Sequence, residues 1–466
     1  MQKNGEYTGV VQSLGTNGEG IIKCGEYVAF VPYCLPQEEV LFKALQVKGK
    51  IVYGKLLKVI KASEQRVEPK CSVCQKCGGC QLQHLSYSGQ LDFKRDLVAN
   101  TLQKIGGVTT EVSPCVCDGE EYRYRNKLAL PIGVDLNGQN AIGFYAERSH
   151  RIVKIEDCPI QSKWVKNVIS AVYSFMDAQK VGGYNEVAKS GLLRHIVVRE
   201  INGAFIIVLV ATKIINVDFL LAELDKTFKN YTFYLNINTV QGNAIFGKEW
   251  HICRGEGFFV AEDCGVKFKT GANTFLQVNN GIRRKLYKEV VKLATAKNTV
   301  ALDLYSGGGM LTAMLANACG QAYGVEIVKE ATACADELKT LNGLNGKMFN
   351  ICGKVEDEIN NVFDLTEGKE RVIVCDPPRK GMERSVIKAI LAAKPNKIIL
   401  VSCNPSTLAR DLGLLCGTLK EDENGQLVKE QTPNSPYTIT QITPFDMFPQ
   451  TKHVESVVCL SRKENI

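Results

Sequence analysis

The chain has 466 residues, which at roughly 150 residues per domain suggests about three domains. Its net charge is +8, and 45% of its residues are hydrophobic and 23% charged, which are ordinary globular values that exclude wholesale disorder. No apolar run approaches the ~20 residues that cross a bilayer, and the first residues lack the apolar core of a secretory signal. We therefore expect a cytoplasmic protein without a membrane partner, whose mild basic excess permits a nucleic-acid partner.

Residues 1–62 are predicted to form a small all-β module. Short apolar runs alternate with breaks containing Gly, Asn or Pro, a spacing typical of a five-stranded barrel. The runs are Tyr7–Leu14, Tyr27–Val31, Val40–Val47 and Ile51–Ile60. Its later part is basic, with Lys48, Lys50, Lys55, Lys58 and Lys61. These lysines either contact RNA or form a solvated strand face.

Residues 63–275 are predicted to form a mixed domain. A hairpin is expected from Arg194–Glu200 and Ala204–Thr212, because Asn202-Gly203 between apolar runs favours a tight primed turn. The segment Tyr122–Lys127 interleaves aromatic and cationic residues, a pattern that suits RNA but also fits a strand with one solvated face.

Residues 276–466 alternate helical and buried-strand patterns, which indicates a parallel α/β sheet. Expected strands are Val300–Leu304, Ala322–Ile327, Val372–Val374 and Ile398–Val401, and expected helices are Ile282–Ala296, Met310–Ala318 and Lys329–Asn342. Two more strand-like runs, Tyr437–Ile442 and Glu455–Leu460, end the chain.

A Gly-rich turn follows the first strand of this sheet, at Asp303–Gly309. Nucleotide-like cofactors bind in the crevice at the carboxyl ends of parallel strands. Glu326 ends the next strand, where an acid suits the diol of a ribose. Together these features indicate an adenosine-containing cofactor; the alternative is an ordinary tight turn and a surface glutamate.

Three further polar segments follow strands of the same sheet. Asp376 lies in Val374–Arg379, and Cys403 lies in Ser402-Cys403-Asn404-Pro405, where a cysteine is a candidate nucleophile. The third segment, Asp446–Glu455, is a polar loop with an acid that could serve as a base.

A metal site is predicted in the middle domain, where four cysteines follow one another at two-residue gaps: Cys71, Cys74, Cys77 and Cys80. A reducing cytosol disfavours disulfides, and thiolates so closely spaced suit zinc or an iron–sulfur cluster. Zinc held by these four thiolates and a site without metal are the alternatives.

The chain resembles the bacterial RNA uridine-5 methyltransferases that carry an N-terminal TRAM barrel and an iron–sulfur cluster. The motifs that carry the resemblance stand in the family's order: Phe275–Asn279, Asp303–Gly309, Asp376–Arg379, Ser402–Pro405 and Phe448–Glu455. One departure is Ser306, where many relatives have Cys. The resemblance implies a multidomain α/β plus β protein: an OB-like TRAM barrel, a central α+β domain with the Cys-rich cluster loop, and a C-terminal Rossmann-like class I methyltransferase domain.

The resemblance also implies a role for each site residue. The nucleophile matches Cys403 and the proton-abstracting base matches Glu455. The contacts to S-adenosylmethionine match Gln277, Tyr305, Glu326 and Asp376. The ligands of a [4Fe–4S] cluster match Cys71, Cys77, Cys80 and Cys158, which leaves Cys74 as an additional thiol.

The expected function is methylation of uridine C5 in 23S ribosomal RNA, which gives 5-methyluridine through a covalent adduct of Cys403 with C6. The expected partner is ribosomal RNA, with no protein partner. One rival is the same reaction on transfer RNA, whose relatives commonly lack the barrel and the cysteine cluster. The other is a non-catalytic RNA-binding or ribosome-assembly factor, against which the intact Cys403 and Glu455 argue.

Overall fold

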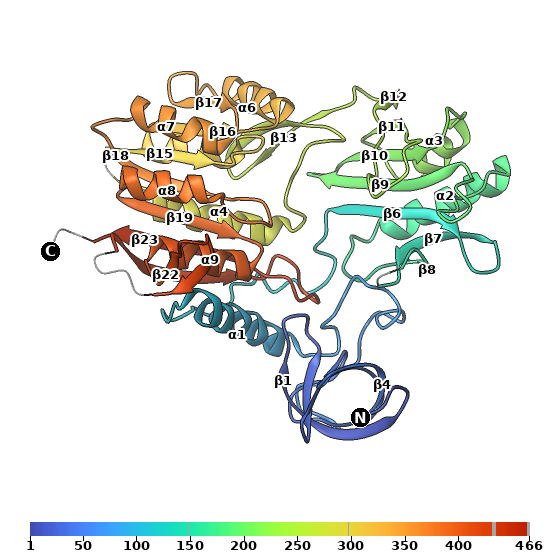
Figure 1. Cartoon of the computed structure of the whole chain (residues 1–466). Helices are drawn as coiled ribbons and strands as arrows, with labels where there is room; N and C mark the ends of the chain where they lie inside the picture. Colours follow the sequence, from blue (N-terminus) through green and yellow to red (C-terminus); the bar gives the residue numbers. More distant parts are fainter. Residues whose placement is uncertain (148, 297, 431–434, 464–466) are drawn as a thin grey trace.

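The structure is a computed structural model that describes residues 1–147, 149–296, 298–430 and 435–463. Figure 1 shows a small barrel at the N-terminal end, below two larger sheet-containing lobes that lie side by side. Within the described ranges, no helix combines the length and apolar character that a membrane span requires.

The N-terminal barrel is closed and five-stranded, as the spacing of its apolar runs predicts. Its strands pair in the order β1-β2-β3-β5-β4 and are β1 (Glu6–Leu14), β2 (Gly20–Cys24), β3 (Tyr27–Val31), β4 (Glu39–Lys48) and β5 (Ile51–Lys61). Alternate residues point inward and fill the core, among them Val11, Ile22, Val31, Phe42 and Val52. The five predicted basic residues are all exposed.

A long helix, α1 (Tyr87–Gly106), connects the barrel to the C-terminal lobe. Ser86 caps its start by accepting a hydrogen bond from the backbone N–H of Gly89, at 3.2 Å. Its last residue, Gly106, permits close contact with α9 (Pro405–Leu415), because a Cβ there would lie 2.3 Å from the carbonyl oxygen of Ala409. The core of the C-terminal lobe also includes side chains of this helix, among them Val98 and Leu102.

The central lobe is built on a seven-stranded sheet of order β12-β11-β10-β9-β6-β7-β8. Its strands are β6 (Lys127–Val134), β7 (Asn140–Tyr145), β8 (Ile152–Lys154), β9 (Leu193–Ile201), β10 (Ala204–Ala211), β11 (Tyr231–Ile237) and β12 (Glu249–Arg254). The predicted hairpin is confirmed as β9–β10, and Asn202 (φ 51°) and Gly203 (φ 80°) both take the positive φ of a primed turn.

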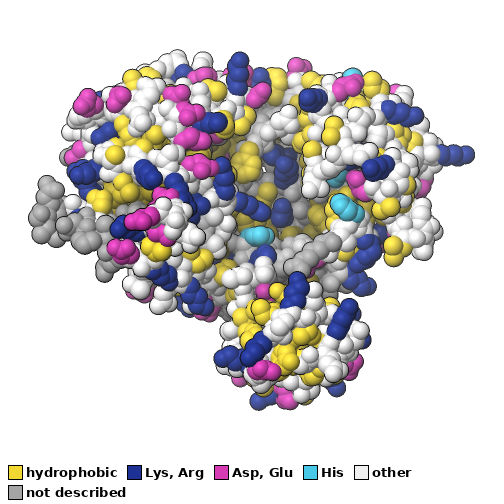
Figure 2. Space-filling view, viewed as in Figure 1, with side chains coloured by type: hydrophobic (Ala, Val, Ile, Leu, Met, Phe, Trp, Pro, Cys, Tyr) yellow, Lys and Arg dark blue, Asp and Glu magenta, His cyan; other side chains and the backbone are white. Residues whose placement is uncertain are grey.

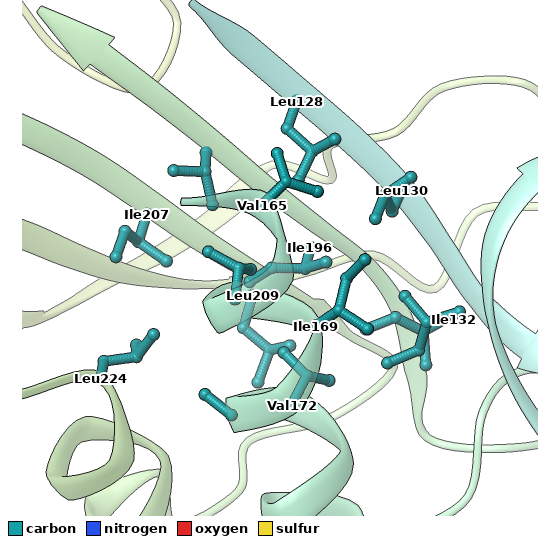
Figure 3. Close-up of a cluster of buried hydrophobic side chains, with 14 of the residues drawn as sticks. Leu128, Leu130, Ile132, Val165, Ile169, Val172, Ile196, Ile207, Leu209 and Leu224 are labelled. Carbon is teal, nitrogen blue, oxygen red and sulfur yellow. The ribbon is translucent and has the colours of Figure 1, made fainter. Parts of the chain in front are cut away.

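One face of this central sheet is covered by α2 (Val165–Gln179) and α3 (Asp218–Asp225). Figure 3 shows that alternate side chains of the strands meet these helices: Leu128, Leu130 and Ile132 from β6, Ile196 from β9, and Ile207 and Leu209 from β10. The residues between them point to the opposite face, which is turned toward the C-terminal lobe.

The C-terminal lobe follows a small hairpin, β13 (Phe259–Asp263) and β14 (Val266–Thr270). Its seven-stranded sheet has the order β17-β16-β15-β18-β19-β23-β22. Five strands are parallel, namely β15 (Thr299–Leu304), β16 (Ala322–Glu326), β17 (Met348–Cys352), β18 (Glu370–Cys375) and β19 (Lys397–Ser402). The last two, β22 (Tyr437–Phe445) and β23 (Glu455–Arg462), are antiparallel.

Helices cover both faces of this sheet. On one face lie α4 (Asn280–Ala294), α5 (Met310–Cys319) and α6 (Lys329–Leu341). On the other lie α7 (Val355–Leu365), α8 (Arg384–Ala393), α9 and α1. A short hairpin, β20 (Leu419–Glu421) and β21 (Leu427–Lys429), follows α9. The sheet thus has the doubly wound arrangement that places ligands at the carboxyl ends of its parallel strands.

Candidate functional site

A cavity of about 510 Å³ opens at the carboxyl ends of the parallel strands. Three of the predicted cofactor residues line it: Tyr305 after β15, Glu326 at the end of β16 and Asp376 after β18. The parallel sheet brings them together, because neighbouring parallel strands end at the same edge. Apolar side chains, including Phe268, Leu276, Met310 and Leu311, form much of the remaining wall.

The Gly-rich turn is fixed by backbone contacts to β16. Tyr305 has a left-handed backbone (φ 73°), and its N–H donates to the carbonyl oxygen of Val325 at 3.0 Å. The Glu326 carboxylate accepts the backbone N–H of Gly307 at 2.9 Å and that of Val328 at 2.8 Å. Glu326 therefore shapes the turn and still presents its remaining lone pairs to the cavity.

Two acids sit side by side on adjacent strands in the wall of this cavity. Asp303 is buried and accepts a hydrogen bond from the Thr312 hydroxyl at 2.6 Å. Burial raises the pKa of Asp303 to about 7, with a further contribution from the Glu326 charge. Burial and the Asp303 charge raise the pKa of Asp376 to about 7 as well. A ligand that donates hydrogen bonds to these two carboxylates would stabilise their charged forms and lower both pKa values.

Gln277 is not among the described residues that line the cavity. Its neighbours Phe275 and Leu276 do line it, and Phe275 is 77% exposed beside the opening. The sequence interpretation also omitted Lys354 and Glu356, which reach the cavity from the loop after β17 and the start of α7. In the sequence, these two residues are marked only by their position just after β17, and the sequence patterns do not predict that strand.

Cys403 and Glu455 are brought together by the pairing of β19 with β23. Ser402 pairs with Ser456 in this antiparallel ladder, so the residue after Ser402 stands beside the residue before Ser456. Glu455 is 4% exposed and Cys403 is half-buried. The predicted nucleophile and the predicted base thus lie next to each other.

The turn that carries Cys403 is set by its own sequence. Asn404 caps α9, because its side-chain oxygen accepts the backbone N–H of Ser406 at 3.0 Å, and Pro405 starts the helix. The Asn404 amide also donates to the backbone carbonyl of Arg379, at 3.0 Å. The cap therefore joins the Cys403 turn to the Asp376–Arg379 segment.

Nearby charges shift the pKa values of both Glu455 and Cys403. Burial and the Asp376 charge raise the pKa of Glu455 to about 8, against the opposing effect of Arg379. Burial and then the Glu455 charge raise the pKa of the Cys403 thiol, while Arg379 lowers it. The exposed Arg379 is thus the cation that faces both groups, and the sequence interpretation gave it no role.

Asp446, at the start of the 446–455 loop, is completely buried and forms an ion pair with Lys94 of α1. Buried and paired in this way, it cannot be the base that the loop was expected to supply, which leaves Glu455 in that position. Other contacts hold the same loop, since Tyr124 donates to the carbonyl oxygen of Pro449 at 3.0 Å and Gln90 donates to the Gln450 side chain at 3.0 Å.

The Tyr122–Lys127 segment is only in part a surface for RNA. Tyr124 is buried, and Arg123 forms an ion pair with Asp157 at 2.6 Å and donates to the Cys158 carbonyl at 3.0 Å. Arg125 and Lys127 remain half-exposed, and within the described ranges neither forms an ion pair. The structural alternative thus applies to part of the segment, and Arg125 also lines a cavity beside the Cys-rich loop.

The Cys-rich loop and Cys158 meet at a second, small cavity of about 90 Å³. Five thiols line it: Cys71, Cys74, Cys77, Cys80 and Cys158. Cys74, Cys80 and Cys158 are buried. In the part of the chain that the structure describes, no group of three or more His, Cys, Asp and Glu side chains is arranged to hold a metal ion.

Comparison with known proteins gives consistent matches over most or all of the chain. The family model described as tRNA (uracil-5-)-methyltransferase matches residues 86–463. An uncharacterized RNA methyltransferase of Staphylococcus epidermidis is 35% identical and covers 100% of this chain and 99% of its own length. A protein of the same description from Clostridium acetobutylicum is 36% identical over 99% of this chain and 98% of its own.

A solved structure is also similar over nearly the full length. The tRNA (uracil-54, C5)-methyltransferase of Pyrococcus abyssi, in complex with S-adenosyl-L-homocysteine, superposes with a TM-score of 0.75. It is 26% identical in sequence, and the match covers 97% of this chain and 99% of that one.

Proposed function

The chain belongs to the S-adenosylmethionine-dependent RNA uracil-5 methyltransferases, and we propose that it methylates uridine C5 in 23S ribosomal RNA through a covalent enzyme–RNA intermediate. The observation that carries the mechanism is the pairing of Ser402 with Ser456, which sets Cys403 beside Glu455. A nucleophile and a base on adjacent strand ends can act in turn on neighbouring carbons of one pyrimidine ring.

Cys403 acts first. Uracil C5 is a poor nucleophile until a thiolate adds to C6, which forms an S–C6 bond and places the electron pair of the C5–C6 double bond on C5 and the adjacent carbonyl. The Cys403 thiol must lose its proton for this step. Arg379 supports the thiolate, because its positive charge lowers the pKa of Cys403. S-Adenosylmethionine, when bound, supplies the methyl group that C5 takes up.

Glu455 acts last. After methyl transfer C5 carries both a methyl group and a proton, and removal of that proton returns the electron pair to the C5–C6 double bond and expels the Cys403 thiolate. A buried carboxylate with a pKa of about 8 is a stronger base than an ordinary glutamate. Because the target base must reach both groups, it is expected to flip out of the folded RNA.

The 510 Å³ cavity supports the assignment of the cofactor residues. Glu326 stands where a ribose diol would meet a carboxylate, and Tyr305 and Asp376 directly follow the adjacent strands β15 and β18. Gln277 is proposed as a further contact on the grounds of the resemblance, and its neighbour Leu276 lines the cavity.

The cavity with five thiols supports a [4Fe–4S] cluster held by Cys71, Cys77, Cys80 and Cys158. Its donor set is of the kind that binds such clusters. When bound, the cluster supplies iron–thiolate bonds that tie the Cys71–Cys80 loop to Cys158. The additional Cys74 thiol is proposed not to be a ligand.

We propose that the chain has three segments with different roles. Residues 1–62 form a TRAM-like RNA-binding barrel, residues 63–275 hold the cluster and contact RNA, and residues 276–466 carry the methyltransferase site. The exposed lysines of β5 and its flanks support the first assignment. We propose that the protein works in the cytoplasm.

Transfer RNA is the second candidate substrate. The Pyrococcus abyssi structure is named for its action on tRNA, and its 97% coverage of this chain includes the N-terminal barrel. The presence of a barrel therefore does not by itself separate the two substrates.

The test is to map 5-methyluridine by mass spectrometry in ribosomal and transfer RNA from a strain of the source organism that lacks the gene. Loss at a site in 23S ribosomal RNA, restored by the wild-type gene and not by Cys403→Ala, is the expected result. Loss of 5-methyluridine from transfer RNA alone would identify transfer RNA as the substrate. Unchanged 5-methyluridine in both RNAs would support the non-catalytic alternative.

A further inference from the structure

The face of the central sheet opposite α2 is partly buried against the C-terminal lobe, and it also carries polar and aromatic groups that the reaction does not use. The register of β6 with β9 places Lys127 opposite Arg199, Ala129 opposite Val197 and Pro131 opposite His195. These pairs share the face turned away from α2. His195 lies four residues along the strand from Arg199, or about 13 Å at the rise of a β-strand.

The Lys127 end of this face adjoins the catalytic cleft. Burial, followed by Arg199 and Arg125, lowers the pKa of Lys127 to about 8. Arg125 in turn lies near His453 of the 446–455 loop. The positive charge of Arg125 helps to lower the pKa of His453. Figure 2 shows Lys and Arg side chains gathered in the recess between the two upper lobes.

The other end of the face is a cavity of about 580 Å³. Its floor is formed by Ala129, Pro131 and His195, and Tyr145, Tyr184 and Lys189 stand around it. It continues toward the Cys-rich loop as a second hollow, which shares Tyr145 with the first.

The chemistry of this cavity matches a nucleoside. The rings of Tyr145 and His150 meet nearly at a right angle, at 5.6 Å between centroids, and form an aromatic corner. Buried Arg194 stacks on the Tyr184 ring at 4.7 Å and holds that ring in place. Aromatic faces of this kind stack on bases without regard to sequence.

His195 lies in the floor of the cavity. Its Nδ1 is buried and has no hydrogen-bond partner within the described ranges. Burial and the charge of Arg194 lower its pKa to about 4, so the ring is neutral at pH 7. A neutral imidazole has one donor and one acceptor, which suits the edge of a base better than a phosphate. Glu186, an acid in the cavity wall, forms an ion pair with Arg194 at 3.4 Å.

We propose that the cavity around Tyr145, Tyr184 and His195 binds a second nucleoside of the RNA strand whose target uridine enters the catalytic cleft. The strand runs over Lys127 and Ala129, which are both partly exposed, and its next accessible base stacks against Tyr145. This proposal rests on the RNA substrate of the proposed function and adds to it a subsite outside the catalytic centre.

The test measures binding of fluorescein-labelled oligouridylates of about 4 to 16 nucleotides, the range of site sizes of single-strand-binding modules, to the full-length protein by fluorescence anisotropy. Wild-type affinity should rise once the oligonucleotide spans both sites. Tyr145→Ala should lower affinity for the long oligonucleotides about tenfold, the effect of losing one base stack, and leave the short ones unchanged. Tyr145→Phe keeps the ring and should bind like wild type.

Phe219→Ala is the matched control, since Phe219 is a partly exposed ring on α3, on the other face of the sheet. Equal affinity of wild type and Tyr145→Ala at every length would overturn the proposal.

If Tyr145→Ala fails to fold, wild type can be crosslinked to an oligonucleotide that contains 4-thiouridine. A crosslinked peptide with Tyr145 or Tyr184 supports the subsite, and crosslinks confined to other segments reject it. Loss of the subsite alone would leave 5-methyluridine formation intact at saturating RNA, whereas failure of the proposed function would abolish methylation by wild type.

Discussion

Lys94 of α1 forms a buried ion pair with Asp446 and also donates a hydrogen bond to the carbonyl oxygen of Phe448, at 3.0 Å. Both charged side chains are completely buried. The contact joins a helix near the N-terminal barrel to the loop that ends at Glu455, with more than 350 residues of chain between them. It fixes the loop from which the catalytic base projects.

Lys94→Met should therefore destabilise the protein by about 3–5 kcal/mol, because it leaves the Asp446 carboxylate buried and unpaired. The double variant Lys94→Met/Asp446→Leu removes both charges and should recover much of that loss. Urea unfolding measures the effect, and Lys104→Met, on an exposed position of the same helix, is the control. Equal midpoints for Lys94→Met and wild type would show that the pair contributes nothing.

The pH dependence of kcat should follow Glu455, because Glu455 acts only after methyl transfer. A base must be deprotonated, and a pKa of about 8 means that the active fraction grows as pH rises through that value. The raised pKa of Cys403 acts in the same direction, since the thiolate fraction also grows with pH. We expect log kcat to rise with a slope of at least about one below this pKa, and a flat profile of kcat over the same range would contradict it.

Removal of the Glu326 carboxylate should weaken cofactor binding. Hydrogen bonds to a charged group contribute roughly 1.5–3 kcal/mol each, and Glu326 also fixes the Gly307 turn. Titration calorimetry of Glu326→Ala with S-adenosylmethionine should show this loss, while Glu330→Ala, an exposed acid on α6, should bind normally. Unchanged affinity of Glu326→Ala would remove it from the cofactor site.

The cysteine cavity should bind iron. Protein purified without oxygen should be brown and contain about four irons per chain, as expected for one [4Fe–4S] cluster. Cys158→Ser should lose most of this iron, whereas Cys74→Ser and the exposed Cys253→Ser should keep it. Stoichiometric zinc without iron would reject the cluster, and iron lost in Cys74→Ser but kept in Cys71→Ser would show that the ligand set is wrong.

Much of the fold follows from local sequence patterns. The five-stranded barrel, the β9–β10 hairpin and the helix–strand alternation after residue 280 are confirmed, with ends that differ by a few residues. Each depends on periodicity and turn chemistry, which neighbouring residues determine. The strand β17 (Met348–Cys352) escaped prediction because it is a sheet edge with half-exposed residues and no buried apolar run.

Long-range contacts could not be predicted in this way. Nothing in the sequence around Lys94 indicates that it lies against Asp446, since the two meet only after the C-terminal sheet has formed. The proximity of Cys403 to Glu455 likewise depends on β23 pairing antiparallel beside β19, which no periodicity specifies. Tyr124 illustrates the opposite case, because a pattern typical of RNA contact includes a side chain that the fold buries.

The central claim is that Cys403 acts before methyl transfer and Glu455 after it. The most direct measurement is a denaturing gel of each variant after incubation with S-adenosylmethionine and RNA containing the target uridine. Glu455→Gln should transfer one methyl group and stall as a Cys403-linked RNA, because loss of a proton-transfer group typically slows its step by ~10²–10⁴. Cys403→Ala should bind RNA and cofactor but neither methylate nor crosslink. Equal inactivity of both variants without a crosslink would remove Glu455 from the role of base, and normal turnover by Cys403→Ala would contradict the mechanism as a whole.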